Sequence, residues 1–237
     1  MKQVLSRRRV AEFLGTLLLV AAVVGSGIMA ERLTNGNVAL ALLTNTIATG
    51  AALVALILAF GPISGAHLNP VVSFMDTLEG GLPWEEVPHY MIAQIVGGVG
   101  GAVTAHLMFG LPIFSLSQHN RTGSSQWFSE FVATFGLLSV IWGCSRTRTR
   151  FVPFAVGAYI TAAYWFTAST SFANPAVTIA RAFSATFAGI RPLDVPWFVF
   201  AQFLGGFAAT VLFRWLIPNL KAQADEVLVP HELERNP

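Results

Sequence analysis

The sequence predicts an all-α membrane protein with six transmembrane helices and two re-entrant half-helices, built as an inverted repeat. The first observation is composition: 54% of residues are hydrophobic and 11% are charged, whereas soluble domains carry about 25% charged residues. The second is that Asp, Glu, Lys and Arg are absent from three long runs, 33–75, 87–120 and 151–180. The third is an Asn-Pro dipeptide followed by a small apolar residue, which occurs in both halves of the chain, at positions 69 and 174.

Six apolar segments are long enough to cross a bilayer, because about 20 residues of helix span the hydrocarbon core. They run over 10–30, 39–60, 88–110, 127–145, 152–170 and 197–217. Two further helical segments, 69–79 and 174–184, are too short to span the membrane. We expect these two to be re-entrant half-helices.

Basic residues predict the orientation, since cytoplasmic loops carry an excess of Lys and Arg. Three clusters flank the predicted spans: Lys2, Arg7, Arg8 and Arg9; Arg146, Arg148 and Arg150; and Arg214 with Lys221. An even number of spans separates each cluster from the next, so all three face the same side. We expect a multi-pass protein of the cell membrane with both termini cytoplasmic. The first half-helix then enters from the cytoplasm and the second from outside.

Short sequence repeats relate the two halves, about 9–110 and 127–217, of a single predicted channel domain, 1–222. The matching pieces are Ala11-Glu12-Phe13 with Ser129-Glu130-Phe131, and Ala93-Gln94 and Gly97 with Ala201-Gln202 and Gly205. Three spans per half give the halves opposite orientations, which is the inverted-repeat architecture of membrane proteins. The remaining residues, 223–237, are polar and are expected to form a flexible cytoplasmic tail.

The repeated motifs, Asn69-Pro70-Val71 and Asn174-Pro175-Ala176, indicate a pore at the middle of the membrane. Asparagine is a strong helix N-cap, and proline is tolerated in the first helical turn. Two half-helices meeting N-terminus to N-terminus direct two positive dipole ends and two amide side chains at one pathway.

These residues closely resemble the major intrinsic protein family of aquaporins and aquaglyceroporins, over about residues 9–217. The resemblance is carried by Ser64-Gly65-Ala66-His67-Leu68-Asn69-Pro70 and Asn174-Pro175-Ala176, together with the Glu-Phe and Ala-Gln repeats. It implies a homotetramer in the lipid bilayer, in which each protomer has its own pore for passive conduction of small neutral solutes. It implies no cofactor, no metal and no nucleic-acid partner. In this family Glu12 and Glu130 support the re-entrant loops by accepting their backbone N–H groups.

The chain departs from the family pattern at two places. Val71 replaces an alanine, and we expect it to narrow or dry the midplane slightly. Val177 stands where family members usually have an arginine, and Thr178 replaces the aspartate typical of glycerol-conducting members. Arg181 lies one helical turn further on, about 5.4 Å nearer the outside, in the outer vestibule. The alternative is that its side chain folds back across this turn and restores a conventional filter.

Spacing assigns the other selectivity-filter positions to Thr49, to Ser171 and to either Ala162 or Tyr164. This combination predicts a wider and less basic filter than the usual one. It is similar to the branch of the family associated with bacterial arsenic-resistance operons. The expected solutes are glycerol-like polyols or neutral arsenicals, such as arsenous acid and its methylated relatives, as well as water.

Several alternatives stay open. Glu12 and Glu130 are intramembrane carboxylates, which are functional or paired, so a proton relay competes with loop support. His67 is either a pH switch or a hydrogen-bonded packing residue, and Asn45 either lines the pore or bonds between helices. A strict water channel and a proton-coupled secondary transporter are the competing functions. An enzyme is not expected, since the sequence has no GxSxG or HExxH motif and no aspartate pair inside the spans.

Overall fold

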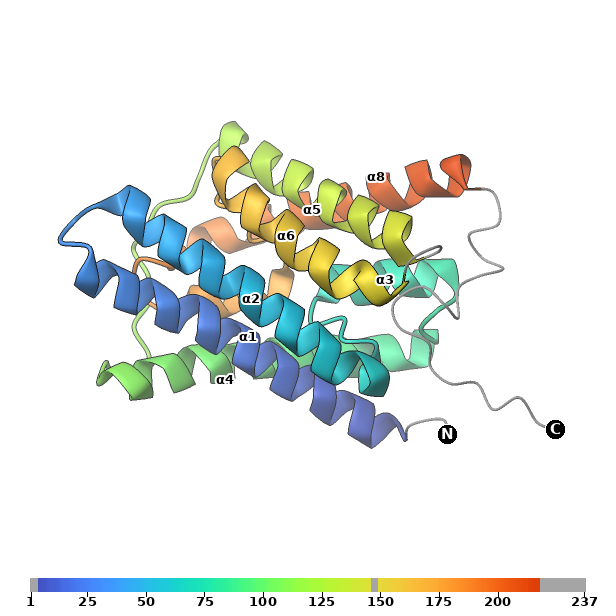
Figure 1. The fold of residues 1–237 in the computed structure, drawn as a ribbon, viewed down its shortest axis with the longest axis horizontal. Helices are drawn as coiled ribbons and strands as arrows, with labels where there is room; N and C mark the ends of the chain where they lie inside the picture. The colour runs from blue at the N-terminus through green and yellow to red at the C-terminus, as the bar shows by residue number, and fades with distance from the viewer. Residues whose placement is uncertain (1–3, 146–148, 218–237) are drawn as a thin grey trace.

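The computed structural model describes residues 4–145 and 149–217, and its elements are helices (Figure 1). The six long helices correspond to the six predicted spans, and two short ones follow the Asn-Pro motifs. The long helices are α1 (Leu5–Leu33), α2 (Val38–Ser64), α4 (Val87–Phe109), α5 (Ser124–Ser145), α6 (Val152–Phe166) and α8 (Val195–Leu216). The short ones are α3 (Pro70–Glu79) and α7 (Pro175–Arg181), with 3-10 turns η1 (Trp84–Glu86), η2 (Thr149–Phe151) and η3 (Pro192–Asp194).

Within the described residues, five helices are long and apolar enough to cross a membrane by length and composition, and α6 is shorter with 15 residues. The predicted span 152–170 was therefore too long at its end. Thr167 takes an extended backbone, φ −110° and ψ 138°, while its hydroxyl and its N–H both bond to the carbonyl of Ala163. The helix stops there because the chain must turn inward toward the second Asn-Pro motif. Similarly, α7 ends at Arg181 rather than at the predicted 184.

The helices repeat with α1–α4 matching α5–α8. Helix α1 packs on α2 and α4, and α5 packs in the same way on α6 and α8. Each half-helix also crosses into the other half, since α3 contacts α8 and α7 contacts α4. Glycines permit the closest crossings: a Cβ at Gly97 would meet the carbonyl of Phe13, and one at Gly205 would meet that of Phe131. The inverted repeat predicted from sequence is thus present in the packing.

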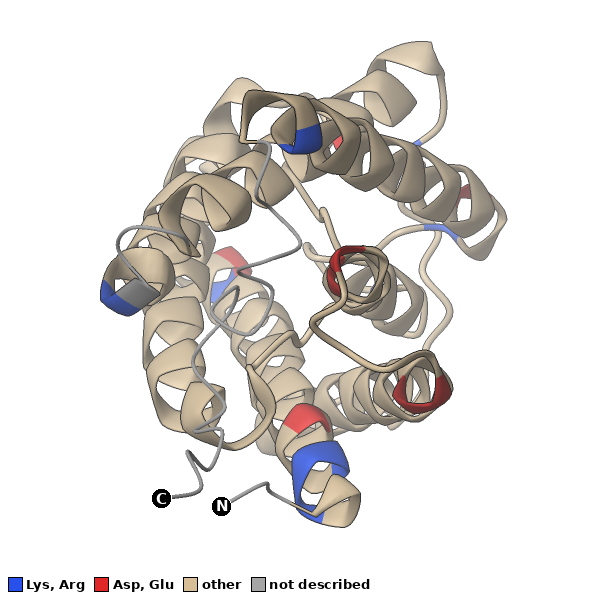
Figure 2. Cartoon of the chain, turned by 90° about the vertical axis from the view of Figure 1, so that its right-hand side faces the viewer, with Lys and Arg blue, Asp and Glu red and all other residues tan. Residues whose placement is uncertain are grey.

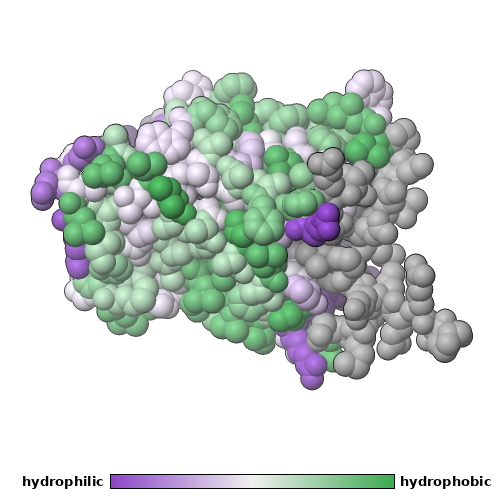
Figure 3. All heavy atoms as spheres, viewed as in Figure 1, coloured by the Kyte–Doolittle hydropathy of each residue, from purple (hydrophilic) through white to green (hydrophobic). Residues whose placement is uncertain are grey.

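Helix α1 begins, and α8 ends, at the same end of the molecule, which we call the terminal end (Figure 1). Figure 2 looks onto this end and shows Lys and Arg at the near ends of several helices. Figure 3 shows apolar side chains over the middle of one face, with hydrophilic residues toward its two ends. Four of the basic residues used for orientation, Lys2, Arg146, Arg148 and Lys221, and the tail 223–237, lie outside the described residues.

Candidate functional site: a cavity between the two half-helices

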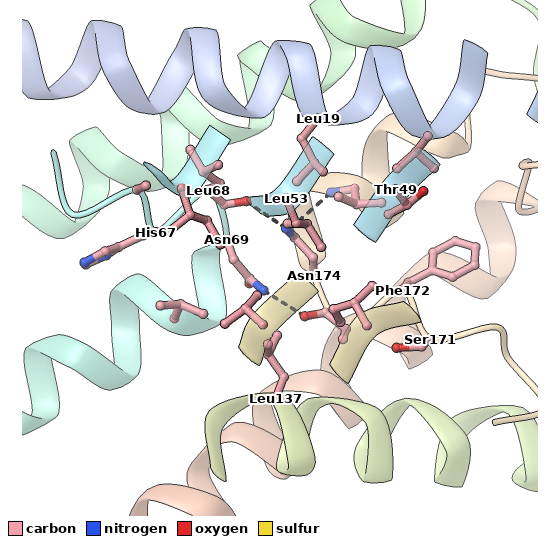
Figure 4. A pocket seen from close by; sticks show the side chains of 18 of the residues that line it. Leu19, Thr49, Leu53, His67, Leu68, Asn69, Leu137, Ser171, Phe172 and Asn174 are labelled. Atoms are coloured by element: carbon pink, nitrogen blue, oxygen red, sulfur yellow. Dashed lines mark hydrogen bonds between the residues drawn. The ribbon is translucent and has the colours of Figure 1, made fainter. Parts of the chain in front are cut away.

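The two motif asparagines hold the re-entrant loops together at the centre of the molecule (Figure 4). Asn69 caps α3 by accepting the N–H of Val71 at 3.0 Å, and Asn174 caps α7 by accepting that of Ala176 at 2.9 Å. Each amide nitrogen then donates to the opposite loop: Asn69 Nδ2 to the Ala173 carbonyl at 2.8 Å, and Asn174 Nδ2 to the Leu68 carbonyl at 2.7 Å. An amide group has two N–H donors, so each asparagine keeps one for a further acceptor.

The loops before the asparagines have an unusual backbone that is the same in both halves. Ala66 and Leu68 have φ of 47° and 49°, and Ser171 and Ala173 have φ of 50° and 49°. These are the third and first residues before each asparagine. Left-handed backbone at residues other than glycine costs on the order of 1–3 kcal/mol each and persists where the surroundings enforce it.

Two buried glutamates stabilise this backbone from behind. Glu12, on α1, accepts the N–H of His67 at 3.0 Å and of Leu68 at 2.7 Å. Glu130, on α5, accepts the N–H of Phe172 at 2.8 Å and of Ala173 at 2.9 Å. A glutamine from the third long helix of each half completes both sites, with Gln94 Nε2 at 2.7 Å from Glu12 and Gln202 Nε2 at 2.6 Å from Glu130. Both carboxylates are fully buried, so their hydrogen bonds are made inside the protein.

A cavity runs past both asparagines, and its two sides differ in chemistry. On one side lie Asn69, Asn174 and the loop backbones (Figure 4). The other side is apolar and is formed by aliphatic side chains from α1, α2, α5 and α6: Leu19, Val23, Leu53, Ile57, Leu137, Ile141, Val156 and Ile160. A passing solute meets hydrogen-bonding groups along one side and hydrocarbon along the other.

Away from the terminal end, the cavity is lined by the residues predicted for a selectivity filter. Thr49 and Tyr164 face each other from α2 and α6, with 3.2 Å between their hydroxyl oxygens. Ser171 and Val177 also line this part, and the buried Ser171 hydroxyl has no hydrogen-bond partner among the described residues. Tyr164 and Ala162 were the two candidates for the filter position on α6. Tyr164 lines the cavity, whereas Ala162 is exposed on the protein surface.

Arg181 lines the same part of the cavity and is 2% exposed. Its Nε donates to the carbonyl of Ala188, and its guanidinium carbon lies 3.4 Å from the centroid of the Phe172 ring. The side chain thus lies in the outer vestibule, bound to a carbonyl and an aromatic ring.

Val71 does not line the cavity, so the expected narrowing of the midplane was wrong. Its side chain is fully buried and faces Gly206 of α8, where a Cβ would collide with it. The extra methyl groups that distinguish valine from alanine are accommodated by a glycine on the neighbouring helix. Pro70, Pro175 and Ala176 are also buried away from the cavity.

The structure also gives the contacts of Asn45 and His67, each of which had two possible roles. Asn45 is buried and donates from Nδ2 to the Val23 carbonyl at 2.8 Å and to Ser26 Oγ at 2.9 Å, so it bonds α2 to α1. His67 lines the cavity near its terminal end, with Nδ1 3.0 Å from Ser73 Oγ and Nε2 3.6 Å from Asp76 Oδ2.

Sequence reasoning missed Arg121, which belongs to the loop 110–123 between α4 and α5. Its side chain is 8% exposed and donates to the carbonyls of Gly189 and Ser169, at 2.9 and 3.1 Å. Its guanidinium carbon lies 4.9 Å from the Phe172 ring centroid. The sequence did contain a signal for this residue, namely an arginine within a long uncharged run. Such an arginine is equally typical of an exposed charge on a loop.

An inverted repeat of membrane-spanning helices around a central cavity is the architecture of a membrane transport protein, and the comparisons identify the family. Residues 1–169 match the family model described as Major intrinsic protein. The chain therefore belongs to the major intrinsic protein family, whose members are channels and not enzymes. It is a multi-pass integral membrane protein and a channel for small neutral solutes.

Two relatives and one solved structure illustrate the similarity. The chain is 58% identical over 213 residues to Aquaglyceroporin AqpS of Rhizobium meliloti (strain 1021), covering 90% of this chain and 91% of that protein. It is 32% identical over 188 residues to Aquaporin NIP6-1 of Arabidopsis thaliana, covering 76% and 60%. The aquaglyceroporin from Plasmodium falciparum shares the fold with a TM-score of 0.68 at 21% identity, covering 92% of this chain and all of that one.

Proposed function

We propose that this chain is a passive channel with a widened selectivity filter, which conducts glycerol-like polyols and neutral arsenicals as well as water. The observation that carries the proposal is Val177, an uncharged side chain in the cavity wall next to Ser171 and the Thr49–Tyr164 pair. An arginine there would add a fixed charge and up to five donors. Valine adds two methyl groups, so it leaves space and removes charge.

The cavity also suits solutes that carry several hydroxyl groups. Ser171, Asn69 and Asn174 line it, and each asparagine has a second N–H beyond the one that it donates to the opposite loop. A polyol or a trihydroxy arsenical presents hydroxyls on one side and a less polar surface on the other. That division matches a cavity that is polar on one side and aliphatic on the other.

The channel domain, 1–222, is proposed to assemble as a homotetramer in the cell membrane with both termini in the cytoplasm. Arg7, Arg8, Arg9, Arg150 and Arg214 at the terminal end support this orientation by the excess of basic residues on cytoplasmic loops. From here on, the end opposite the terminal end is called the outer end. Sedimentation of the detergent-solubilised protein as monomers over a broad concentration range would count against the tetramer.

The filter is tested with Val177→Arg, alone and combined with Thr49→Trp, in proteoliposomes assayed by stopped-flow light scattering. Flux of glycerol and arsenous acid should fall more than flux of water. Val177→Leu is the matched control, because it adds volume without charge and separates the two effects. Solute selectivity that is unchanged by Val177→Arg would refute the assignment of the filter.

The same assay decides between the competing functions. The hydrogen-bonded Thr49–Tyr164 pair and the buried Arg181 both occupy space at the outer end of the cavity. If glycerol does not permeate, these side chains exclude it and the protein is a strict water channel. A proton-coupled transporter requires flux that depends on a proton gradient. The four donors bound to Glu12 argue against a relay, since its oxygens already accept from Ser64, His67, Leu68 and Gln94.

A further inference from the structure

We propose that the barrier to cations and protons in this channel lies in a cluster of Arg121, Phe172 and Arg181, in which Arg181 comes one helical turn after the filter residue Val177. The proposal rests on the function as a neutral-solute channel. It adds a charge filter in the same part of the cavity as the size filter, and this charge filter includes a residue, Arg121, from the loop between α4 and α5.

The cluster is held together by one aromatic ring. The guanidinium carbons of Arg181 and Arg121 lie 3.4 and 4.9 Å from the Phe172 ring centroid. Phe172 follows Ser171 in the re-entrant loop, and its N–H is bonded to Glu130 at 2.8 Å. Cation–π contacts strengthen when they are desolvated, and both arginines are at least nine-tenths buried. The ring therefore fixes two cations beside the cavity that Arg181 and Phe172 line.

Carbonyl groups hold both arginines, so their charge is not cancelled by an ion pair. Arg181 donates to the Ala188 carbonyl, and Arg121 donates to those of Gly189 and Ser169. In the part of the chain that the structure describes, the ion pairs involve other arginines and a histidine. A neutral acceptor satisfies a guanidinium donor and leaves its full positive charge in place.

Two carboxylates lie near the cluster, and both have other partners. Asp194 Oδ2 accepts the backbone N–H of Arg121 at 2.9 Å, while Asp194 Oδ1 is paired with Arg191 Nη2 at 2.8 Å. Glu130 accepts two loop N–H groups and Gln202 behind the loop. Burial, the largest cause, lowers the pKa of Arg121 to about 10, so this side chain still carries its charge at neutral pH.

The arrangement separates two tasks that a single arginine at position 177 would combine. An uncharged wall at Val177 and Ser171 determines which sizes of solute pass. Beside this wall, Arg181 and Phe172 line the same cavity, and the cluster presents positive charge to every entering molecule. Neutral solutes lose little there, whereas a cation is repelled in a poorly solvated passage where Coulomb interactions are strong.

The test uses Arg121→Met, Arg181→Met and the double variant of the full chain in proteoliposomes. Proton entry is followed with an internal pH dye under a potassium diffusion potential, and sodium entry with a sodium dye. Each single variant should leak cations about tenfold faster, since one unit charge about 10 Å away at an effective dielectric constant near 20 changes a rate by roughly that factor. Glycerol and water flux should remain close to wild type in Arg121→Met, because Arg121 is not among the residues that line the cavity.

Arg32→Met is the matched control. Arg32 also lies against a phenylalanine, 5.1 Å from the Phe109 ring centroid, and donates to the Phe109 carbonyl at 2.9 Å. It is exposed at the outer end of α1 and does not line the cavity. The Arg32→Met channel should remain impermeable to cations. Arg121→Lys and Arg181→Lys keep the positive charge, so these channels should also remain impermeable to cations.

Cation exclusion that is unchanged in the double Met variant would overturn the proposal and leave the barrier at the half-helix dipoles. If a Met variant loses all flux through misfolding, the Lys variants decide: a cation leak with the charge retained would also overturn it. A different result would refute the proposed function: a wild-type protein that conducts no neutral solute, whatever the cation leak of the variants.

Discussion

The arginines at the two ends of the cavity have different hydrogen-bonding and ion-pair partners. At the terminal end, arginines are paired with carboxylates: Arg8 lies 2.6 Å from Glu86, and Arg214 lies 2.5 Å from Glu79. At the outer end, the two arginines nearest the cavity are bonded to carbonyls instead. The pairs at the terminal end join helical elements and cancel charge, whereas Arg121 and Arg181 at the outer end join loops and retain it. The inverted repeat therefore reproduces the backbone but not the electrostatics.

The re-entrant loops themselves are alike in detail. Each has left-handed residues before its asparagine, and each is bonded to a buried glutamate and a glutamine. The difference lies in the count of donors: Glu12 also accepts from Ser64 Oγ at 2.6 Å. Substitutions at matching positions measure how far the two halves are equivalent, beginning with the glutamates.

Removing a buried glutamate should have the largest effect. Glu12→Gln and Glu130→Gln each place an amide N–H against a backbone N–H and leave a donor unpaired, at a cost of about 2–4 kcal/mol. The apparent Tm in detergent should fall by about 10 °C, and more for Glu12→Gln because it binds more donors. Glu85→Gln, at an exposed glutamate, is the control. Equal stability of all three variants would contradict the role of the carboxylates in the loops.

Replacing a motif asparagine should reduce conduction more than stability. In Asn69→Asp or Asn174→Asp the cap oxygen is kept, but an oxygen replaces the nitrogen that donates to a carbonyl of the other loop. The resulting repulsion and the added negative charge should lower glycerol flux by about tenfold, and they should weaken the opposition to cations. Stopped-flow and ion-leak assays measure both effects. Wild-type conduction in both variants would remove the asparagines from the pathway.

The sequence predicted the fold well because its signals were local. Uncharged runs, the basic clusters and the two Asn-Pro motifs determine spans and topology with little need of tertiary contacts. The six long helices and the two half-helices were all predicted, but α6 and α7 end earlier than predicted. Thr167 ends α6 for a reason that appears only in three dimensions.

The site was less predictable because a residue's direction depends on its neighbours. Spacing alone could not choose between Tyr164 and Ala162, which differ by half a helical turn. It could not show that Val71 faces Gly206 instead of the cavity. Arg121 could not be found, since its partners Ser169, Phe172 and Gly189 come from the chain about fifty to seventy positions later.

The two motifs differ in their third residue, and this difference is open to a smaller test. Val71→Ala removes two buried methyl groups and should cost about 2 kcal/mol, with flux unchanged because the side chain does not line the cavity. Gly206→Ala should also destabilise, because its Cβ collides with Val71. The double variant should be more stable than the sum of the single effects predicts. Additive losses of Tm, or a changed glycerol flux in Val71→Ala, would contradict the assigned packing.

The smallest predicted effect is a pH dependence at the outer end. His119 lies in the loop 110–123, and burial first, then the positive charges of Arg121 and Arg181, lower its pKa below the usual 6.5. The folded protein therefore binds fewer protons than the unfolded chain as the pH falls. The stability from neutral His119 is fully present above pH 6.5 and is lost as the pH falls from there through the lowered pKa.

The decrease in Tm from pH 7.5 to 5.5 should be smaller in His119→Gln than in wild type, by no more than about 2 °C since the side chain is partly exposed. Gln118→Ala, in the same loop and without a titrating group, should leave the dependence unchanged. Arg121→Met should reduce it, because the removed charge is one of those that repel a protonated His119. A pH dependence that survives His119→Gln intact would show that the outer arginines do not act on this loop, and it would weaken the contrast between the two ends of the cavity.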